Sequence, residues 1–257
     1  MMRYKRKKVD TQQNPSWLDI CLTEEAKEYL WDRINNSEGE DARKNLAGNI
    51  SKSSLIEDKD NWFYENVLKE MTEHMFFKKS WDEYYDVYIA KIKPHPKFHL
   101  KTLWVNYQKQ YEFNPPHNHG GIFSFVVFMK IPTYWKEQHA LPTSANSNTP
   151  VASNFAFHDK NLSLESSNVR LSPDDEGRML FFPAWLKHEV FPFYECEEER
   201  ITISGNIQLY EPDRFKFRVK GGEYEKKKNA LKMLEVTVEG VKKELEYLKK
   251  QEDRKIK

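Results

Sequence analysis

Two histidines, His117 and His119, stand two positions apart in this sequence, directly before a long apolar run. Side chains two residues apart in an extended chain point to the same side of it. Two imidazoles on one face form half of a metal site, and imidazole nitrogen is a ligand for iron, zinc, copper and nickel. The spacing therefore predicts that this pair binds a metal ion together with a ligand from another strand.

A third imidazole and a guanidinium follow later in the chain. His188 lies about seventy residues after the pair, and Arg200 comes twelve residues after His188. His188 on a neighbouring strand would complete three protein ligands on one side of a metal, as a non-haem Fe(II) site requires. Across one hairpin, Arg200 would lie beside the metal and bind a carboxylate through bidentate, charge-assisted hydrogen bonds. Thr202, on the same strand face, would add a hydroxyl donor, and Asn106 and Asn206 are candidates for lining the pocket.

Several of these residues could also have another role. His119 could support the metal from outside its ligand set or act as a base. Arg200 could form a surface ion pair with the glutamates at 197–198. For the two asparagines, hydrogen bonding in the core is an equal alternative. Trp104 and Trp185 are expected to pack in the core rather than to stack on a substrate.

The elements that must position these residues are strands. Apolar and polar side chains alternate from residue 99 to about residue 114, and residues 122–131 read as a strand buried on both faces. Further strands are expected at 154–158, 178–182, 188–191 and 200–210. Several short strands with turn signals between them predict a mainly β protein, an antiparallel sandwich or jelly roll.

Helices are expected on either side of these strands. Residues 17–35, with Thr23 as a plausible N-cap, and residues 60–77 carry apolar side chains at helical spacing and would buttress the β core. Between them, residues 36–54 read as loop or weakly ordered chain. Residues 1–15 read as a polar arm.

The last part of the chain has a different composition. Residues 223–257 are rich in Lys and Glu, and their apolar residues recur at spacings of three and four: Leu231, Leu234, Val238, Val241, Leu245 and Leu248. This heptad pattern predicts a coiled-coil-like C-terminal helix. Docking on the parent domain and a homodimer through residues 224–250 are both open, and a frayed tail is the third reading.

The overall charge excludes little and favours no charged partner. The chain has 257 residues, with 41 basic against 40 acidic side chains and a net charge of +1. This balance gives no general argument for binding nucleic acid or a membrane surface. The longest apolar run, residues 122–129, is far too short to span a bilayer. Cys21 and Cys196 form no disulfide framework, so a reducing, cytoplasmic location is expected.

Three segments together carry a family pattern: residues 113–125 (FNPPHNHGGIFSF), 181–188 (FFPAWLKH) and 200–206 (RITISGN). In these segments the chain resembles the 2-oxoglutarate/Fe(II)-dependent oxygenases, and more narrowly the versions carried by marine bacteriophages. The resemblance covers roughly residues 17–212. It implies a double-stranded β-helix (jelly roll) domain over residues 16–222, with its β core at about 99–212. If the protein is phage-encoded, its location would be the cytoplasm of the infected host cell.

The resemblance also implies a reaction and roles for the residues. Fe(II) would be the cofactor and 2-oxoglutarate the cosubstrate, with dioxygen consumed, succinate and carbon dioxide released, and an unidentified substrate hydroxylated. His117 matches the first metal ligand of the family and His188 the distal one. Arg200 and Thr202 match the residues that bind the far carboxylate of 2-oxoglutarate. His119 stands where most of the superfamily has Asp or Glu.

This departure at His119 keeps two other functions open. Three neutral imidazoles leave Fe(II) with a higher net charge than two imidazoles and a carboxylate, which could favour an anionic fourth ligand or a different metal. A metal-binding jelly roll without turnover is one alternative. A three-histidine, cupin-type dioxygenase that does not use 2-oxoglutarate is the other, and Arg200 argues against it because such an enzyme needs no carboxylate clamp.

Overall fold

The computed structural model describes residues 4–6, 16–37, 39–78, 97–159 and 168–210. The chain divides into two units, residues 1–210 and 211–257. The predicted C-terminal helix and its dimer interface lie outside the described residues, as does most of the predicted polar arm. Among the described helices, none has the length and apolar character needed to cross a membrane.

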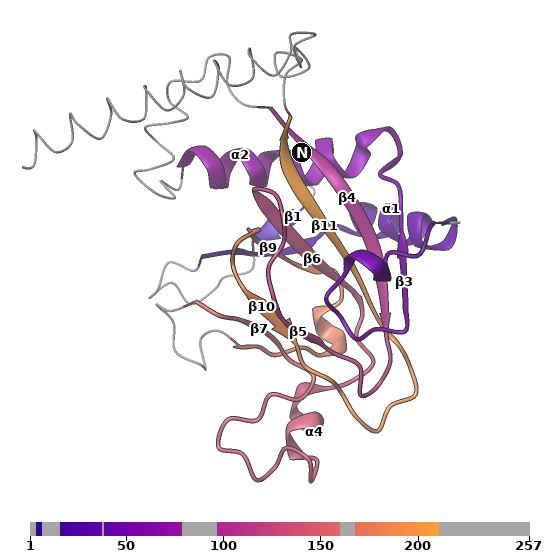
Figure 1. Cartoon of the computed structure of the whole chain (residues 1–257), viewed down its shortest axis with the longest axis vertical. Helices are drawn as coiled ribbons and strands as arrows, with labels where there is room; N and C mark the ends of the chain where they lie inside the picture. Colours follow the sequence, from indigo (N-terminus) through magenta and orange to yellow (C-terminus); the bar gives the residue numbers. More distant parts are fainter. Residues whose placement is uncertain (1–3, 7–15, 38, 79–96, 160–167, 211–257) are drawn as a thin grey trace, which may run out of the picture. The chain divides into compact units, whose positions relative to one another are not determined.

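The described unit is built on two antiparallel sheets (Figure 1). The larger sheet has seven strands in the order β1 (Tyr4–Arg6), β2 (Leu18–Leu22), β9 (Arg178–Pro183), β6 (Phe123–Lys130), β11 (Arg200–Tyr210), β4 (Lys97–Gln108) and β3 (Lys52–Leu55). The smaller sheet has four, in the order β5 (Asn114–His117), β10 (His188–Val190), β7 (Phe155–Phe157) and β8 (Asn168–Val169). The mainly β, antiparallel architecture predicted from the sequence is confirmed.

Successive strands from β4 to β11 alternate between the two sheets, with β7 and β8 as the one neighbouring pair in the same sheet. This alternation gives a jelly-roll-like arrangement. It corrects one expectation: His188 and Arg200 are not joined by a hairpin. His188 lies on β10, which pairs with β5 and β7, whereas Arg200 lies on β11, which pairs with β4 and β6. The connection at residues 191–199 therefore crosses from one sheet to the other.

Two apolar clusters hold these layers together. One lies between the sheets and contains Val126, Phe128, Phe155, Phe157, Leu180 and Phe182. The other lies on the opposite face of the larger sheet, where helices cover it (Figure 1). Neighbouring positions of β6 therefore contribute to different clusters, as the alternation of side chains across a strand requires. This explains why the strand predicted at 122–131 is apolar throughout.

Helix α1 (Glu24–Asn35) covers part of that outer face. Thr23 is its N-cap, as predicted, and accepts a hydrogen bond from the backbone nitrogen of Ala26 at 3.4 Å. The predicted start at residue 17 was wrong, because residues 18–22 form β2. Leu18, Ile20 and Leu22 have the period of two that a strand requires, and β2 pairs with β9 along this stretch.

The second predicted helix, at 60–77, is present in three pieces: a 3-10 turn (Lys59–Asn61), a π-helical turn (Tyr64–Leu68) and α2 (Lys69–Lys78). The segment expected to be weakly ordered, residues 36–54, contains a 3-10 turn (Arg43–Asn45) and most of β3. The remaining helices are short: α4 (Trp135–Ala140) and a 3-10 turn (Pro173–Asp175).

The strand expected from residue 99 to about 114 ends earlier, at Gln108. Tyr111, in the turn that follows, has a positive φ of 68°. Chain pairing resumes in β5, which includes Pro115 and Pro116. Proline lacks the donor that an interior strand needs, and β5 tolerates it because it is the edge strand of the smaller sheet.

Gly205, in the middle of β11, has no room for a side chain. A Cβ atom there would lie 2.6 Å from Cζ of Phe125, which is fully buried, and 2.8 Å from the carbonyl oxygen of Thr102. We expect Gly205→Ala to lower the free energy of unfolding by about 2–3 kcal/mol through overpacking. The melting temperature should fall by about 5–10 °C, measured by differential scanning calorimetry. Gly120→Ala is the control: no neighbour lies within 4 Å of its Cβ, so a loss of similar size there would contradict the explanation.

Candidate metal centre

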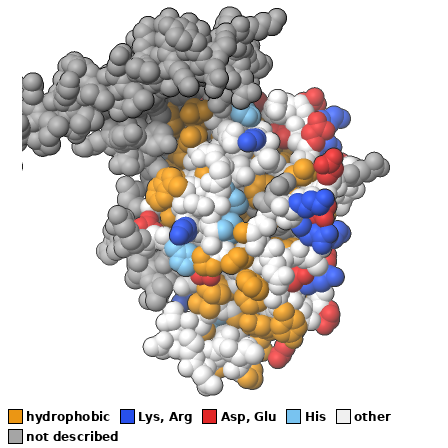
Figure 2. Space-filling model, in the orientation of Figure 1, with side chains coloured by type: hydrophobic (Ala, Val, Ile, Leu, Met, Phe, Trp, Pro, Cys, Tyr) orange, Lys and Arg blue, Asp and Glu red, His pale blue; other side chains and the backbone are white. Residues whose placement is uncertain are grey.

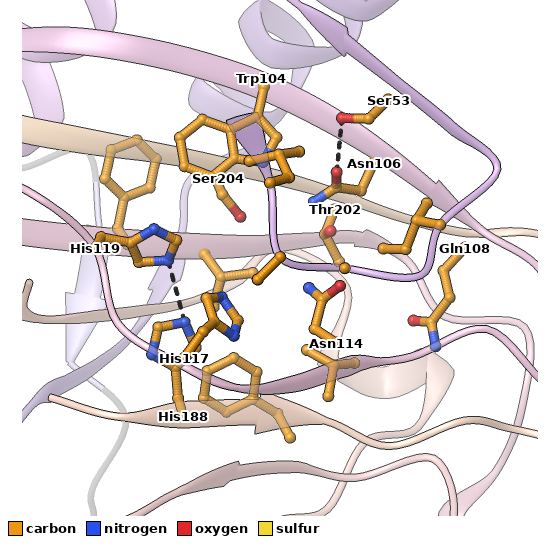
Figure 3. A pocket seen from close by; sticks show the side chains of 18 of the residues that line it. Ser53, Trp104, Asn106, Gln108, Asn114, His117, His119, His188, Thr202 and Ser204 are labelled. Atoms are coloured by element: carbon orange, nitrogen blue, oxygen red, sulfur yellow. Dashed lines mark hydrogen bonds between the residues drawn. The ribbon is translucent and has the colours of Figure 1, made fainter. Parts of the chain in front are cut away.

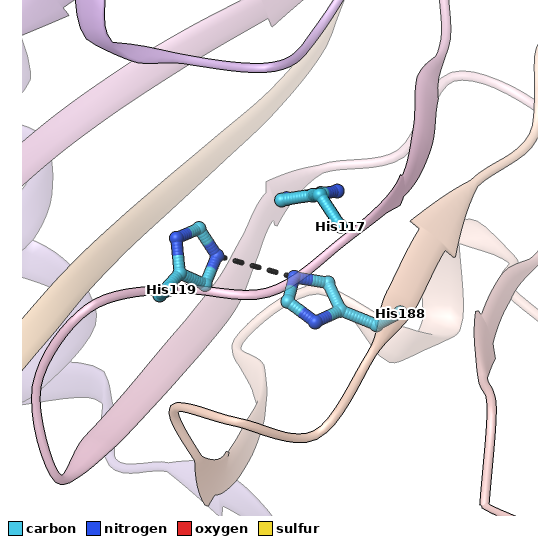
Figure 4. Close-up of side chains that lie close together, drawn as sticks. All are labelled: His117, His119 and His188. Carbon is cyan, nitrogen blue, oxygen red and sulfur yellow. Dashed lines mark hydrogen bonds between the residues drawn. The ribbon is translucent and has the colours of Figure 1, made fainter.

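Two neighbouring strands bring the three predicted histidines together (Figure 4). His117 ends β5 and lies directly opposite His188, the first residue of β10, in the antiparallel ladder. His119 follows two residues after the end of β5, where its backbone nitrogen donates to the carbonyl oxygen of Ala184 at 2.8 Å. One ligand nitrogen from each ring lies within 4.8 Å of the others.

Backbone carbonyls orient two of the three rings. Nδ1 of His117 lies 2.7 Å from the carbonyl oxygen of Pro115, and Nδ1 of His188 lies 3.0 Å from that of Leu186. A carbonyl oxygen only accepts, so each Nδ1 carries the proton and donates. Each Nε2 therefore keeps its lone pair. This is the way proteins commonly fix a metal-binding histidine, through a hydrogen bond on the ring nitrogen that does not bind the ion.

The third ring completes a set of donors suited to a metal. Nε2 of His119 lies 3.2 Å from Nε2 of His188. Two nitrogens bound at right angles to one ion, each about 2.1 Å from it, are about 3.0 Å apart, so this separation fits neighbouring ligands of a single ion. The ring of Trp104 packs against His119, with 5.7 Å between ring centroids. The three imidazoles thus fit a transition metal that prefers nitrogen ligands.

Burial keeps these imidazoles neutral. Burial, together with the positive charge that His117 would carry, lowers the pKa of His119 to about 4 and that of His188 to about 3. Burial also lowers the pKa of His117, against the opposing effect of its bond to Pro115. Because a metal ion binds the neutral form, all three rings are ready to act as ligands at neutral pH.

This electrostatic setting predicts how metal affinity depends on pH. An ordinary histidine, with a pKa of about 6.5, begins to lose its ligand lone pair to a proton below pH 7. The lowered pKa values of His119 and His188 move that competition to more acidic solution. We expect the affinity for Co(II), titrated anaerobically, to change little from pH 8 to pH 6 and to fall only below about pH 5. A steep loss between pH 7 and pH 6 would contradict this expectation.

A cavity of about 150 Å³ adjoins the three histidines (Figure 3). Its polar lining, besides the histidines, includes Ser53, Asn106, Gln108, Asn114, Thr202 and Ser204, and its apolar lining includes Trp104, Phe128, Phe155 and Phe182. The segment at 46–50 also contributes to the wall. In Figure 2, histidine side chains are visible near the centre of one face, beside a hydrophobic patch, and His117 and His119 are only partly buried.

The structure places two of the three other predicted pocket residues at the cavity and one outside it. Thr202 and Asn106 line the cavity, and Oδ1 of Asn106 accepts a hydrogen bond from Ser53 at 2.8 Å. Asn206 lies outside the lining, and its Nδ2 donates to Oγ1 of Thr102 at 3.2 Å. Oδ1 of Asn206 is buried without a hydrogen-bond partner among the described residues.

Arg200 is completely buried and does not itself line the cavity. Its Nη2 donates to the carbonyl oxygen of Ser153 at 2.9 Å and to the hydroxyl of the same residue. Its Nη1 donates to Oε1 of Gln108 at 3.4 Å, and the guanidinium lies 5.2 Å from the centre of the Phe193 ring. Gln108 does line the cavity, so Arg200 lies directly behind the cavity wall.

The guanidinium of Arg200 has no carboxylate within 4 Å among the described residues. The surface ion pair considered above is wrong: Glu197 accepts from Gln110 at 2.7 Å, and Glu198 pairs with Lys130 at 2.7 Å. Burial lowers the pKa of Arg200 to about 10, and its Nε is buried without a partner in the described part of the chain. A buried cation with a free N–H donor fits a ligand that brings its own carboxylate.

Some residues of the site were not predicted. Gln108 could have been found, because it continues the alternation of Trp104 and Asn106 along β4. The wall segment at 46–50 lies within residues 45–51, which also resemble the phage proteins, but no role in the site was predicted for it. The expectation that Trp104 packs is confirmed, since it is 4% exposed, but the same expectation was wrong for Trp185, which is 60% exposed on the turn before His188.

Several solved structures are similar to this chain over part of its length. An oxidoreductase of the 2OG-Fe(II) oxygenase family from Burkholderia pseudomallei is 12% identical, with a TM-score of 0.37; the match covers 58% of this chain and 54% of that one, about half its length. The viral collagen prolyl hydroxylase of Paramecium Bursaria Chlorella virus-1 is 12% identical, with a TM-score of 0.45, over 76% and 96% of the chains. A Pseudomonas putida prolyl-4-hydroxylase is also 12% identical, with a TM-score of 0.45, over 76% and 94%.

No curated protein matches this chain. A family model does match it over residues 102–206, and its description is "Putative 2OG-Fe(II) oxygenase". The matched segment begins in β4 and ends in β11, so it contains the three histidines, Gln108 and Arg200. The resemblance to the 2OG-Fe(II) oxygenases is therefore confirmed over residues 102–206, and this family uses Fe(II) and 2-oxoglutarate. The narrower resemblance to phage proteins stays a prediction.

Proposed function

We propose that this protein is a 2-oxoglutarate- and Fe(II)-dependent dioxygenase with a double-stranded β-helix core. It would couple the oxidative decarboxylation of 2-oxoglutarate to the hydroxylation of a substrate that is not identified. One observation carries the proposal: a three-histidine cluster lines a cavity, and a buried, uncompensated arginine lies directly behind the wall of that cavity. A metal site alone would not require the arginine.

The histidines would hold the ion through their Nε2 atoms. Carbonyl oxygens fix the rings of His117 and His188, so these two ligands need no reorganisation when the metal binds. When bound, Fe(II) would supply the activation of dioxygen, with 2-oxoglutarate as the reductant. The chain's part is to orient the reactants and to exclude water from them.

The cavity would hold the cosubstrate between the metal and Arg200. In Figure 3 the histidines lie on one side of the cavity and Gln108 on the other, with Thr202, Asn106 and Asn114 between them. Oδ1 of Asn114 is buried without a partner among the described residues, so it is free to accept a hydrogen bond. The oxo acid end would lie at the histidines and the distal carboxylate at the Gln108 side, where the positive charge of Arg200 stabilises it.

His119 gives this site an overall charge that differs from most of the superfamily. With three neutral imidazoles, Fe(II) keeps both positive charges, whereas a carboxylate ligand would cancel one. The dianion 2-oxoglutarate compensates that charge by Coulomb attraction in a partly buried site. We therefore regard the histidine as compatible with cosubstrate binding.

The test is direct. The full chain is loaded with Fe(II) under anaerobic conditions, and 2-oxoglutarate is added while the visible spectrum is recorded. A charge-transfer band is expected, and admission of dioxygen with a library of candidate substrates should release succinate. Metal binding without such a band would favour the non-catalytic metal-binding module. Oxygen consumption that does not depend on 2-oxoglutarate would favour the three-histidine, cupin-type dioxygenase.

A further inference from the structure

The walls of the cavity carry almost no charge of their own. Among the described residues that line it, none is an aspartate or a glutamate, and Arg43 is the single lysine or arginine. Both carboxylate oxygens of Asp41 accept from the guanidinium of Arg43, at 2.7 to 3.0 Å, so this pair is neutral as a whole. The lining therefore supplies no free negative charge to a bound metal ion.

The acidic side chains that flank the lining residues in sequence are engaged outside the cavity. Glu189, the residue after the third histidine of the cluster, pairs with His158 at 2.9 Å. The two carboxylate oxygens of Glu112 accept from the backbone nitrogens of Ser51 and Lys109, each at 2.9 Å. Neither glutamate belongs to the described lining. A metal ion held by three neutral imidazoles would therefore keep both of its positive charges.

The proposed complex with Fe(II) and 2-oxoglutarate would retain one positive charge. The ion contributes two positive charges, and Arg200, buried behind the wall, contributes a third. The cosubstrate brings only two negative charges. A carboxylate in place of His119 would cancel the remaining charge, so the histidine at this position is the reason that it persists.

This charge would lie at the open end of the cavity. His117 and His119 are only partly buried, and histidine side chains reach the surface near the centre of the face in Figure 2. The opposite end is closed, since Gln108 is 3% exposed and Arg200 is completely buried. A second molecule that enters from solvent therefore meets the histidine end first.

We propose that His119 is a specificity-determining residue and that it selects a substrate with a carboxylate group. The uncompensated positive charge would bind that carboxylate at the histidine end of the cavity, beside the cosubstrate. One unit of charge in a partly buried site changes the affinity for a monoanion by about 10- to 100-fold. This rests on the proposed function, because it concerns the same site, and it adds the chemical class of the substrate.

The experiment uses the full chain, loaded with Co(II), saturated with 2-oxoglutarate, and titrated with acetate or with acetamide in a calorimeter. The two probes have nearly the same size and shape but differ in charge. Wild type should bind acetate at least about tenfold more tightly than acetamide. His119→Asp and His119→Glu should reduce this preference to within about threefold by weakening acetate alone.

Asn118→Asp is the matched control, because it adds a carboxylate one residue away without changing the histidines. Asn118 lines the cavity but is exposed, so solvent and salt screen a charge placed there. The preference for acetate should stay within about threefold of wild type. An equal loss in Asn118→Asp would assign the preference to surface charge and overturn the role of His119.

Turnover distinguishes a substrate from a free anion. Molecules that stimulate succinate release by the Fe(II)-loaded wild type should carry a carboxylate, and their amides should stimulate it at least about tenfold less. Stimulation by neutral molecules alone would overturn the inference, as would wild type without a preference for acetate. Failure of both variants at His119 to bind Co(II) would overturn it too, because a carboxylate must be able to replace this ligand. If wild type gives no charge-transfer band with Fe(II) and 2-oxoglutarate, the proposed function fails instead.

Discussion

Replacing His188 by alanine is expected to lower the affinity for Fe(II) by at least about 100-fold. Loss of a group that merely orients a metal ligand costs 10- to 100-fold in affinity, so loss of the ligand itself should cost no less. His188 lies opposite His117 in the ladder and within 3.2 Å of His119, so its removal leaves two imidazoles that cannot surround the ion. Succinate release should fall to the level of a protein-free blank.

The measurement must separate metal loss from unfolding. His188 is 3% exposed and packs against the rings of Phe155 and Phe182, at centroid distances of 5.4 and 4.7 Å. Alanine would leave a small cavity there, and the metal-free variant should lose about 1–3 kcal/mol of stability. The decisive comparison is the shift in melting temperature on adding Fe(II) or Co(II), since a ligand that binds only the folded state raises it. Wild type should show the shift and His188→Ala should not.

His158→Ala is the matched control for this experiment. His158 lies just beyond β7, and its Nε2 pairs with Glu189 at 2.9 Å on a side chain that is 42% exposed. It is a histidine close in space to the cluster but outside it, so its loss should leave the metal-induced shift intact. Metal affinity that survives in His188→Ala, or is lost equally in His158→Ala, would remove the basis for the three-histidine site.

The sequence predicted the members of this cluster better than the geometry that joins them. The spacing of His117 and His119 suggested one strand face, yet β5 ends at His117 and a bond to Ala184 positions His119 instead. Register between β5 and β10 places His188, and no local pattern reports such long-range pairing. The crossing between sheets at residues 191–199 could not be predicted for the same reason. A short acidic loop has the same sequence pattern whether it joins two paired strands or two strands in different sheets.

The wall of the cavity shows a second limit of local patterns. Residues 46–50 were expected to be loose chain, and they are held in place by long-range backbone contacts such as that from Asn49 to the carbonyl oxygen of Phe113, at 2.8 Å. Similarly, residues 18–22 extended a helical stripe in the sequence but form β2 beside β9. Where pairing with distant parts of the chain determines the local structure, it overrides the local propensity of the sequence. The alternation in β4 and β11 succeeded because one face of each strand is apolar and its central residues, such as Val105 and Ile203, are buried.

Arg200→Ala should weaken 2-oxoglutarate binding by about 100-fold while Fe(II) stays bound. The estimate follows from losing the positive charge that stabilises the distal carboxylate from behind the cavity wall, in a buried setting. No histidine of the cluster contacts Arg200, whose hydrogen bonds go to Ser153 and Gln108. Titration of 2-oxoglutarate into the anaerobic Fe(II) protein, followed by its charge-transfer band, measures the loss. Arg200→Lys should recover part of the affinity, because it restores the charge without the planar fork.

Arg178→Ala is an instructive comparison, because the two arginines differ in their partners. Arg178 is partly buried and pairs with Asp19 at 2.6 Å and with Asp175 at 3.3 Å, so alanine there leaves the buried carboxylate of Asp19 unpaired and should cost about 3 kcal/mol of stability. Arg200→Ala leaves no charge behind and should destabilise the protein less. We therefore expect different profiles. Arg178→Ala should show the larger fall in melting temperature with normal 2-oxoglutarate affinity, and Arg200→Ala the smaller fall with weakened 2-oxoglutarate affinity. Loss of iron from Arg200→Ala with unchanged 2-oxoglutarate affinity would sink the assignment of this residue.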